Sequence, residues 1–258
     1  MRCIVLGSGS KGNATLVEAG QTRILIDNGF SGKELLARLH LAGIDPPSLS
    51  AVLITHEHND HIGGVGVLAR RLNLPVYANV ATHRAAEAKV RQIPQRQEFN
   101  TGESFVIGDL HIHAFSVGHD TADPVGFTLT DGLHSFGYCT DTGSITRLIR
   151  YSLSSCQALV LEANHDVPML RAGPYPLPLQ QRVLSLHGHL ANSDALQLAV
   201  ELAAGQLRKL VFAHLSEVNN HPQLLLQEIA RRKDELARLD IGLACQHCLG
   251  PVLKLGKP

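Results

Sequence analysis

The sequence His-Glu-His-Asn-Asp-His at positions 56–61 constrains this chain more than any other stretch. It follows the apolar run 51–55, which predicts a buried strand, and it precedes an amphipathic helix that begins near Val65. Three imidazoles and a carboxylate are ligands that zinc-like divalent cations prefer. Residues two apart diverge on a helix but can converge on one ion from a loop. We therefore expect a loop in which His56 and His58 bind one metal while Asp60 and His61 turn toward a second.

Two other interpretations of this stretch are weaker. The single-metal helix motif H-E-x-x-H is excluded, because Asp60 stands where its second histidine belongs. A merely polar surface loop is disfavoured by the other histidines and acids that end predicted strands elsewhere in the chain.

The composition is that of an ordinary globular protein, with 44% hydrophobic and 18% charged residues in 258 positions. Lys plus Arg and Asp plus Glu are equal at 23 each, so net charge does not indicate nonspecific binding of nucleic acid. The chain starts directly in an apolar strand without a signal-peptide pattern, and its apolar runs are shorter than the roughly 18 residues of a membrane span. Five scattered cysteines suit a reducing compartment. We expect a cytoplasmic protein that does not associate with membranes.

Predicted strands and helices alternate along the whole chain without a break in composition. This pattern favours an α/β fold with one domain over residues 1–258, built as a four-layer αββα sandwich of two mixed β-sheets flanked by helices. Gly7, Gly9 and Gly12 match a dinucleotide-binding pattern, but a strand rather than a helix is predicted next, so we reject that interpretation. The Pro- and Gly-rich residues 168–178 are interpreted as a surface connection. A late amphipathic helix is expected to carry Leu225 through Leu239.

Polar residues with metal-binding or acid–base chemistry gather where predicted strands end, and loops at such ends form the sites of layered folds. They are Asp27, His56 to His61, His119, Asp141, Glu162 and His214.

Taken in order, these strand-end residues resemble the five motifs of the metallo-β-lactamase-fold hydrolases over nearly the whole chain. The resemblance implies that one metal is bound by His56, His58 and His119 and the other by Asp60, His61 and His214. It also implies that Asp141 bridges the two metals and that Asp27 anchors the histidine loop from behind. A carboxylate at position 141, instead of a cysteine, goes with two-metal hydrolases rather than antibiotic-cleaving enzymes.

Further segments resemble the nuclease-like branches, ribonuclease Z and its relatives. Glu-Ala-Asn-His at 162–165 is similar to an acidic segment of that family, and Gly-His-Leu-Ala-Asn at 188–192 is similar to the segment that carries its catalytic histidine. With Gly-Ser-Gly-Ser-Lys-Gly-Asn at 7–13, these segments most resemble the YycJ/WalJ-type branch of phosphodiesterases, which includes DNA exonuclease-type activity. A long Gly/Pro-rich arm of the tRNA-processing enzymes is not visible, and His165 replaces the threonine of their acidic segment.

The leading hypothesis is therefore a two-metal phosphodiesterase, exonuclease-like, in which a metal-bridging hydroxide attacks a phosphodiester of nucleic acid or of a small molecule. Asp60 would orient the nucleophile, and His189, held by Glu162, would protonate the leaving oxygen. Asn164 and His165 are candidate substrate contacts, with bracing of the site the alternative for His165. Ser8 and Asn13 are candidates for phosphate contact or for shaping the turn.

Several alternatives stay open at the level of sequence. The seven ligands would also serve a thioester hydrolase of the glyoxalase II type, and a metal-binding module without catalysis is the non-enzyme alternative. His and Asp ligands accept zinc, manganese or iron. The pair Cys245 and Cys248 lacks the second pair that a closed zinc site needs, so we expect no metal there. Oligomeric state is not predicted.

Overall fold

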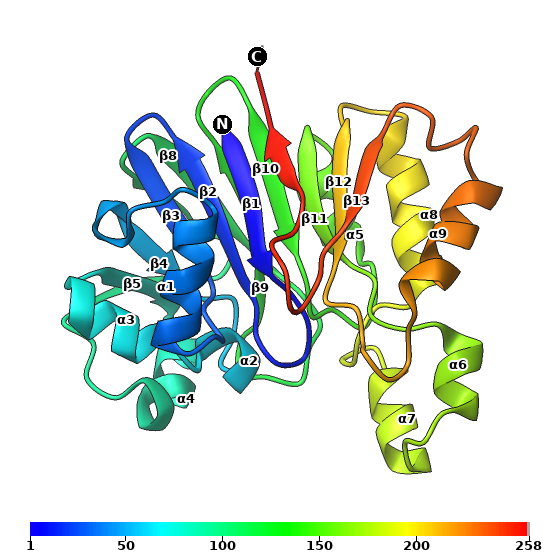
Figure 1. The fold of residues 1–258 in the computed structure, drawn as a ribbon, viewed down its shortest axis with the longest axis horizontal. Helices are drawn as coiled ribbons and strands as arrows, with labels where there is room; N and C mark the ends of the chain where they lie inside the picture. The colour runs from blue at the N-terminus through cyan, green and yellow to red at the C-terminus, as the bar shows by residue number, and fades with distance from the viewer. Residues whose placement is uncertain (257–258) are drawn as a thin grey trace.

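The computed structural model describes residues 1–256 and contains two seven-stranded mixed sheets that pack face to face between layers of helices (Figure 1). The predicted four-layer αββα sandwich is confirmed. The first sheet has the order β14-β1-β2-β3-β4-β5-β6, and the second has the order β13-β12-β11-β10-β9-β8-β7. The strands of the first sheet are β1 (Arg2–Gly7), β2 (Ala14–Ala19), β3 (Thr22–Ile26), β4 (Ala51–Leu53), β5 (Pro75–Asn79), β6 (Gln95–Phe99) and β14 (Val252–Lys254). Those of the second are β7 (Ser104–Ile107), β8 (Leu110–Ser116), β9 (Val125–Thr130), β10 (Ser135–Cys139), β11 (Ala158–Glu162), β12 (Lys209–Ala213) and β13 (Asp240–Leu243).

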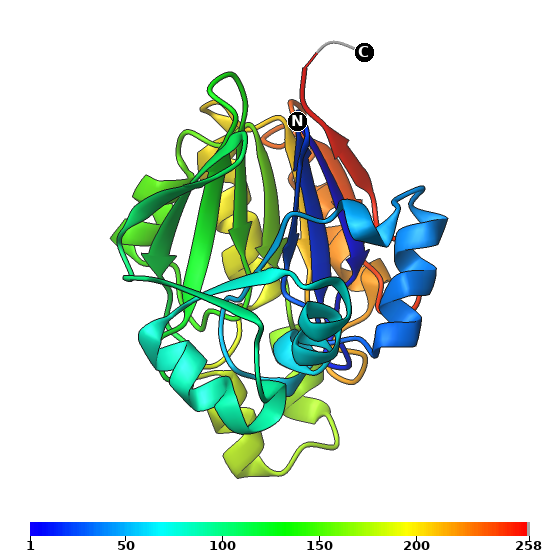
Figure 2. The same ribbon diagram turned by 90° about the vertical axis from the view of Figure 1, so that its left-hand side faces the viewer.

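Helices cover both outer faces of the sandwich. The first sheet is covered by α1 (Gly32–Leu41), α3 (Val65–Leu72) and α4 (Val80–Val90), and the second by α5 (Arg147–Leu153), α8 (Asn192–Ala203) and α9 (Pro222–Arg231). A short 3-10 helix (Pro46–Ser48) precedes β4. The remaining helices α2 (Asn59–Ile62), α6 (Val167–Ala172) and α7 (Leu177–Val183) lie at one edge of the sandwich, from which α6 and α7 project in both ribbon views (Figures 1 and 2).

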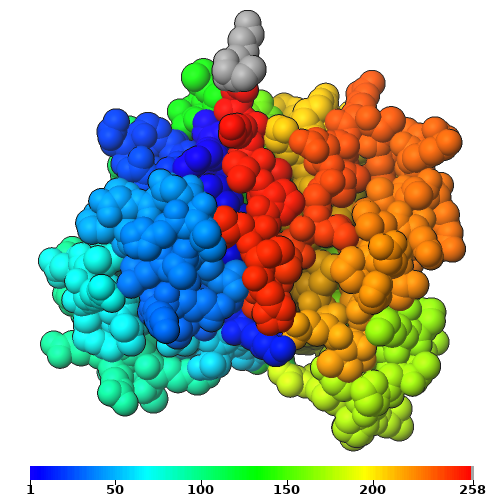
Figure 3. Space-filling view, viewed as in Figure 1, coloured from blue at the N-terminus to red at the C-terminus, as the bar shows by residue number. Residues whose placement is uncertain are grey.

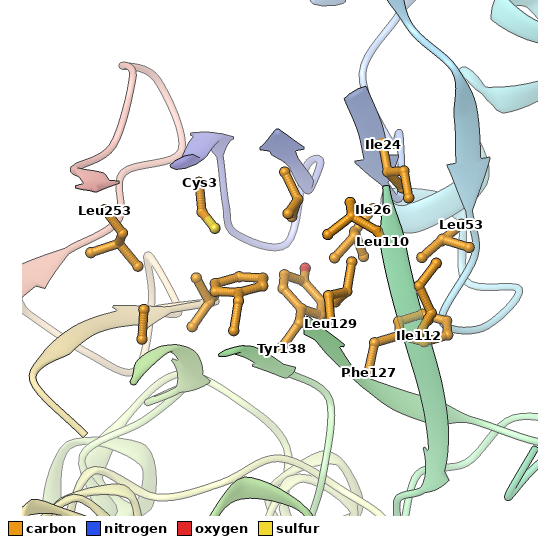
Figure 4. Packing of buried hydrophobic residues seen from close by; sticks show 14 of the residues in the cluster. Cys3, Ile24, Ile26, Leu53, Leu110, Ile112, Phe127, Leu129, Tyr138 and Leu253 are labelled. Carbon is orange, nitrogen blue, oxygen red and sulfur yellow. The ribbon is translucent and has the colours of Figure 1, made fainter. Parts of the chain in front are cut away.

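The central core lies between the two sheets, and the alternation of side chains explains its composition. In β1, Cys3 and Val5 face the second sheet, whereas Ile4 and Leu6 face the helices. Strands buried on both faces read as continuous apolar runs, which is how β1, β3 and β11 appear in the sequence. Figure 4 shows Ile24, Ile26 and Leu53 of the first sheet beside Leu110, Ile112 and Phe127 of the second.

The two ends of the chain meet in the first sheet. Strand β14 pairs antiparallel with β1, with Arg2 opposite Lys254. Figure 3 shows this C-terminal segment running over the face between the N-terminal and C-terminal halves of the chain. The last strand therefore joins the half of the protein that the first strand begins.

Strand direction decides where the predicted site residues meet. β3 and β4 run parallel in the first sheet, and β10, β11 and β12 run parallel in the second. The carboxyl ends of these five strands lead into Asp27, the histidine loop, Asp141, Glu162 and His214. The expectation that chemistry gathers at strand ends is thus met at one edge of the sandwich, beside α2.

Residues 168–178 are not the plain surface connection that we predicted. They contribute to α6 and α7, and each helix carries a proline in its first turn. Proline needs no hydrogen-bond acceptor at this position and its fixed φ suits a helix start, so Pro168 and Pro178 begin helices here. The side chain of Asp166 also accepts a hydrogen bond from the N–H of Met169 at 2.8 Å and thereby caps α6.

Two other local predictions were incomplete. Helix α9 ends at Arg231, so the predicted helix does not continue to Leu239. Strand β6 was missed because four of its five residues are exposed and polar, which leaves no alternation to detect. None of the helices within residues 1–256 is long and apolar enough to cross a membrane.

The hairpin between β9 and β10 turns at Asp131, whose carboxylate organises the turn. It accepts hydrogen bonds from the N–H groups of Leu133 and His134 at 3.0 and 2.7 Å and contacts the His134 ring at 3.1 Å. Burial alone would raise the pKa of Asp131, but the N–H and ring of His134, together with Leu133, lower it to about 2.

We expect Asp131→Ala to lower the free energy of unfolding at pH 7 by about 1–2 kcal/mol, the scale of hydrogen bonds to a charged group at a partly exposed site. Because the pKa is lower in the folded state, this contribution is present above the unfolded-state pKa near 4 and is lost as pH falls toward 2. The difference between variant and wild type in urea unfolding should therefore shrink between pH 4 and pH 2. A difference that stays constant over this range would contradict the assignment.

Candidate metal centre

Three residues of the site leave their strands with a left-handed backbone. Asp27 follows β3 directly with φ of 59°, His214 follows β12 directly with φ of 55°, and Asp141 follows β10 by two positions with φ of 56°. This conformation is uncommon for residues other than glycine, although Asp, Asn and His adopt it more readily than most. The side chains of these three residues contact other residues of the site: Asp27 and Asp141 lie against His61, and His214 lies against Asp141.

The first group of potential ligands consists of His56, His58 and His119, with ligand atoms that all lie within 4.8 Å of one another. The Nδ1 of His58 and the Nε2 of His119 are 3.2 Å apart. Two nitrogens bound to one tetrahedral ion at 2.0–2.1 Å are roughly 3.3 Å apart, so this spacing fits a shared cation. His119 Nδ1 donates to the carbonyl of Gly188 at 2.9 Å, which leaves Nε2 free for the ion.

Asp27 and Thr55 fix the tautomers of the neighbouring rings. Asp27 is fully buried and accepts the Thr55 N–H and the Thr55 hydroxyl, both at 2.8 Å, and the Nδ1–H of His61 at 2.8 Å. Because the Thr55 hydroxyl hydrogen is used in this way, the Nδ1–H of His56 donates to Thr55 Oγ1 at 2.9 Å. The Nε2 atoms of His56 and His61 are therefore unprotonated and suited to be ligands; that of His56 has no hydrogen-bond partner among the described residues, and that of His61 lies 3.0 Å from the Asn13 amide nitrogen.

The second group consists of Asp60, His61 and His214, again with ligand atoms within 4.8 Å. An Asp60 oxygen lies 3.5 Å from His61 Nε2 and 3.3 Å from His214 Nε2. Asp141 stands between the two groups, with one oxygen 3.2 Å from His61 Nε2 and the other 3.8 Å from His119 Nε2. A carboxylate in this position can reach two cations at once.

Glu162 holds two histidines with one oxygen. Its Oε1 accepts the Nδ1–H of His189 at 2.8 Å and the Nδ1–H of His214 at 2.9 Å. Its Oε2 accepts the backbone N–H groups of Thr142 and Leu190 at 2.9 and 3.1 Å. Both oxygens are thereby occupied, which makes Glu162 a support for the two rings rather than a metal ligand. The Nε2 of His189 is left free.

In the described part of the chain the carboxylates of the site have no Lys or Arg beside them, and this favours the binding of metal cations. Within residues 1–256, no Lys or Arg forms an ion pair with Asp27, Asp60, Asp141 or Glu162, and imidazoles are their only ionisable partners. Burial opposes a proton on His214, yet Asp141, Asp60 and Glu162 raise its pKa to about 10. Buried anions need compensating positive charge, which protons or metal ions supply.

Buried atoms without hydrogen-bond partners indicate whether metal ions fit this centre. Two buried ligand atoms, His56 Nε2 and Asp141 Oδ2, have no hydrogen-bond partner among the described residues. Buried polar atoms without a partner are rare and call for an explanation. Both atoms face the space that the two ligand groups surround, so the residue set fits a pair of divalent cations.

The glycine-rich turn at residues 7–13 contacts the metal-binding residues through Ser8 and Asn13. Ser8 accepts the N–H of His214 at 2.9 Å and donates to Asn13 Oδ1 at 2.7 Å. The Asn13 amide also donates to the Asp60 carboxylate at 3.3 Å. Both side chains are buried and occupied within the protein, so of the two roles predicted for Ser8 and Asn13 the structure favours turn formation over substrate contact.

The two residues after Ala163 lie close to His189 and His214. Asn164 lines a cavity next to His189 and donates to the carbonyl of His214 at 2.9 Å. His165 is 1% exposed, and neither ring nitrogen has a partner among the described residues. Burial lowers the pKa of His165 to about 4, so the ring is neutral.

Two residues that matter for the geometry escaped sequence reasoning. Thr55 fixes the rings of its neighbours, and its position directly before the histidine motif was the available signal. Gly29 lets the histidine loop approach, because a Cβ there would lie 1.8 Å from the carbonyl oxygen of Asp60. Cys245 and Cys248 belong to none of the ligand groups found in residues 1–256.

Comparison with known proteins agrees with this geometry. The family model described as the beta-lactamase superfamily domain matches residues 22–215. The chain is 37% identical over 233 residues, 90% of its length and 88% of the relative's, to the protein named exodeoxyribonuclease YycJ of Bacillus anthracis. It is 36% identical over 244 residues, 93% of its length and 89% of the relative's, to the protein named exodeoxyribonuclease WalJ of Streptococcus pneumoniae.

Among solved structures, the metallo-β-lactamase fold protein YhfI of Bacillus subtilis aligns with a TM-score of 0.73 at 19% identity, over 98% of this chain and 99% of that protein. At this identity the likeness concerns the fold alone. Together with the family model and the two relatives, it places the chain among the metallo-β-lactamase-fold hydrolases, in the family of YycJ and WalJ.

Proposed function

We propose that the protein is a two-metal exodeoxyribonuclease that hydrolyses phosphodiesters from the end of a DNA strand. His56, His58 and His119 are assigned to one ion and Asp60, His61 and His214 to the other, with Asp141 between them. Zinc or manganese is the metal that we assign, and iron is compatible with the same ligands. The names of the two similar proteins support DNA as the substrate. The five free cysteines and the nucleic-acid substrate support a cytoplasmic location.

The observation that carries the proposal is the pair of His189 and Glu162, which adds an acid to the ligand set. Bound divalent cations supply Lewis acidity and a water of lowered pKa. The Nδ1 of His189 lies 3.7 Å from an Asp141 oxygen, so the ring borders the metal centre. Burial opposes protonation of His189, but Glu162 raises its pKa above the usual value. A protonated His189 with a free Nε2 can donate to the oxygen that leaves when a phosphodiester is cleaved.

The roles of the remaining site residues are assigned from their positions in the structure. Asp60 shares its carboxylate between the second ligand group and Asn13, and from there it can orient a nucleophile. Asn164 is assigned a contact with substrate, because it lines the cavity beside His189. His165, neutral and buried behind it, is assigned a hydrogen bond to a substrate group or to a water that substrate contacts. The pairing of β14 with β1 supports one domain over the whole chain.

The direct test compares metal-loaded protein on DNA and RNA labelled at either end and on an acylated glutathione. We expect stepwise release of mononucleotides from DNA, with little cleavage of RNA and little thioester hydrolysis. Hydrolysis of the thioester with intact DNA would replace the proposal by a glyoxalase II-type activity.

We expect His189→Ala to lower the rate of DNA hydrolysis by about 10²–10⁴-fold, the usual contribution of a general acid. Hydrolysis of bis(p-nitrophenyl) phosphate should fall much less, because p-nitrophenolate leaves without a proton. Metal content, measured by mass spectrometry of the ions, should stay at two per chain.

His187→Ala is the matched control, since His187 is exposed two positions before His189 and should behave as wild type. Equal losses of His189→Ala on both substrates would remove the acid assignment.

We expect Asp27→Asn to weaken metal binding by about 10–100-fold, the usual effect of losing a carboxylate that orients a ligand histidine. Asn tolerates the left-handed backbone, so the substitution mainly replaces one carboxylate oxygen by an NH₂ group. In that position the NH₂ group would face two other donors, the Nδ1–H of His61 and the Thr55 hydroxyl, and could accept a hydrogen bond from neither. Chelator competition measures the affinity, and excess metal should restore turnover.

Asp109→Asn is the control, because Asp109 also accepts several hydrogen bonds but lies at the β7–β8 turn. Unchanged metal affinity of Asp27→Asn would show that Asp27 does not orient a ligand.

A further inference from the structure

A cavity of about 130 Å³ lies directly beside the proposed acid His189. One wall consists of Tyr175, Leu179 and Arg182, which belong to α7 and the turn before it. The opposite wall includes Asn164 and Asn219, from the loops after β11 and β12. Helix α7 and the turn before it therefore form one wall of a space that lies beside His189.

The volume limits what this space can hold. A protein cavity of about 150 Å³ accepts one benzene molecule, so a space of about 130 Å³ holds at most one base, without its sugar, and excludes two stacked bases. A substrate whose phosphodiester lies between His189 and the metal ligands would place the adjoining base here.

The walls offer the two contacts that bases use. Tyr175 is partly exposed and Leu179 is apolar, and an aromatic side chain beside a base provides a stacking surface. Asn219 is 1% exposed, and its Oδ1 has no hydrogen-bond partner among the described residues. Each of the four DNA bases carries both an N–H donor and an acceptor, so the Asn219 amide can pair with any of them through its N–H or its oxygen, without selecting a sequence.

Charge favours a base over a second phosphate in this position. Arg182 is the basic residue of the wall, and its Nε donates to the carboxylate of Asp120 at 2.5 Å. Asp120 also lines the cavity, so the two charges neutralise each other there. The cavity therefore presents no free positive charge of the kind that phosphate recognition uses.

We propose that this cavity binds the base of the terminal nucleotide of the DNA strand, stacked on Tyr175 and hydrogen-bonded to Asn219. The proposal rests on the proposed nuclease function and deepens it. A pocket for one base next to the cleaved bond places a strand end, one nucleotide at a time, against His189 and so produces exonucleolytic cleavage.

The test uses metal-loaded full-length protein and two single-stranded oligonucleotides that differ only at the end that is cleaved. One carries an ordinary terminal nucleotide, and the other carries an abasic tetrahydrofuran residue there. We expect wild type to prefer the ordinary end by about 5- to 150-fold in kcat/KM, the range that base–aromatic stacking of roughly 1–3 kcal/mol corresponds to.

Two variants examine the pocket by opposite means. Tyr175→Ala removes the stacking surface and Leu179→Trp fills the space, so both should reduce the preference for the ordinary end toward one. Tyr151→Ala, which removes a tyrosine that is 80% exposed on α5, should retain the full preference.

A preference that survives in both pocket variants, or a wild type that cleaves both ends equally, would overturn the pocket while leaving the nuclease intact. A wild type that cleaves neither oligonucleotide would instead overturn the proposed function, so the two failures can be told apart.

Discussion

Buried carboxylates at strand ends are the constraint on which the rest of this structure depends. Asp27 and Glu162 are fully buried and Asp141 is 2% exposed, and their ionisable partners within the described residues are imidazoles. Isolated buried charges cost several kcal/mol each, so this edge of the sandwich is stable only when cationic rings or metal ions occupy it. The same requirement makes the site effective, because cations held among fixed anions and oriented rings need little reorganisation during a reaction.

The backbone at these strand ends suits the same residues. A chain that leaves a strand and must turn its next side chains back toward the core benefits from a left-handed residue, and Asp and His tolerate that conformation better than most. Asp27, Asp141 and His214 thus combine the required chemistry with a tolerable backbone. Hydrogen bonds hold two of them in place: Asp27 through Thr55, and His214 through Ser8 and Glu162. Strained positions of this kind persist only where the surroundings determine them, which is typical of functional sites.

The sequence predicted the parts of the structure that short-range rules control. The apolar run 51–55 located β4, and local spacing divided the histidine loop between two metals. The pairing of His119 with His58, 61 positions apart, could not follow from spacing and depended on resemblance to a family. Thr55 was missed because its role lies in the direction of one hydroxyl hydrogen, which composition and periodicity do not encode.

The helices α6 and α7 were missed for a different reason, which is that proline has two structural meanings in a sequence. Proline marks both chain breaks and helix starts, and only the cap at Asp166 and the surrounding contacts decide between them.

These two helices bury only Leu170 and Val183 between them, whereas α8 alone buries seven residues. Elements with few buried apolar contacts open at lower free energy than a packed sheet or helix layer. The metal ligands therefore lie where packed strands end, while one wall of the adjoining pocket lies on a helix, α7, with few buried apolar contacts. If the proposed function holds, such a division would let a strand end enter and a product leave without disturbing the metal centre. Substrate preference could then change through α7 while the ligand set stays the same.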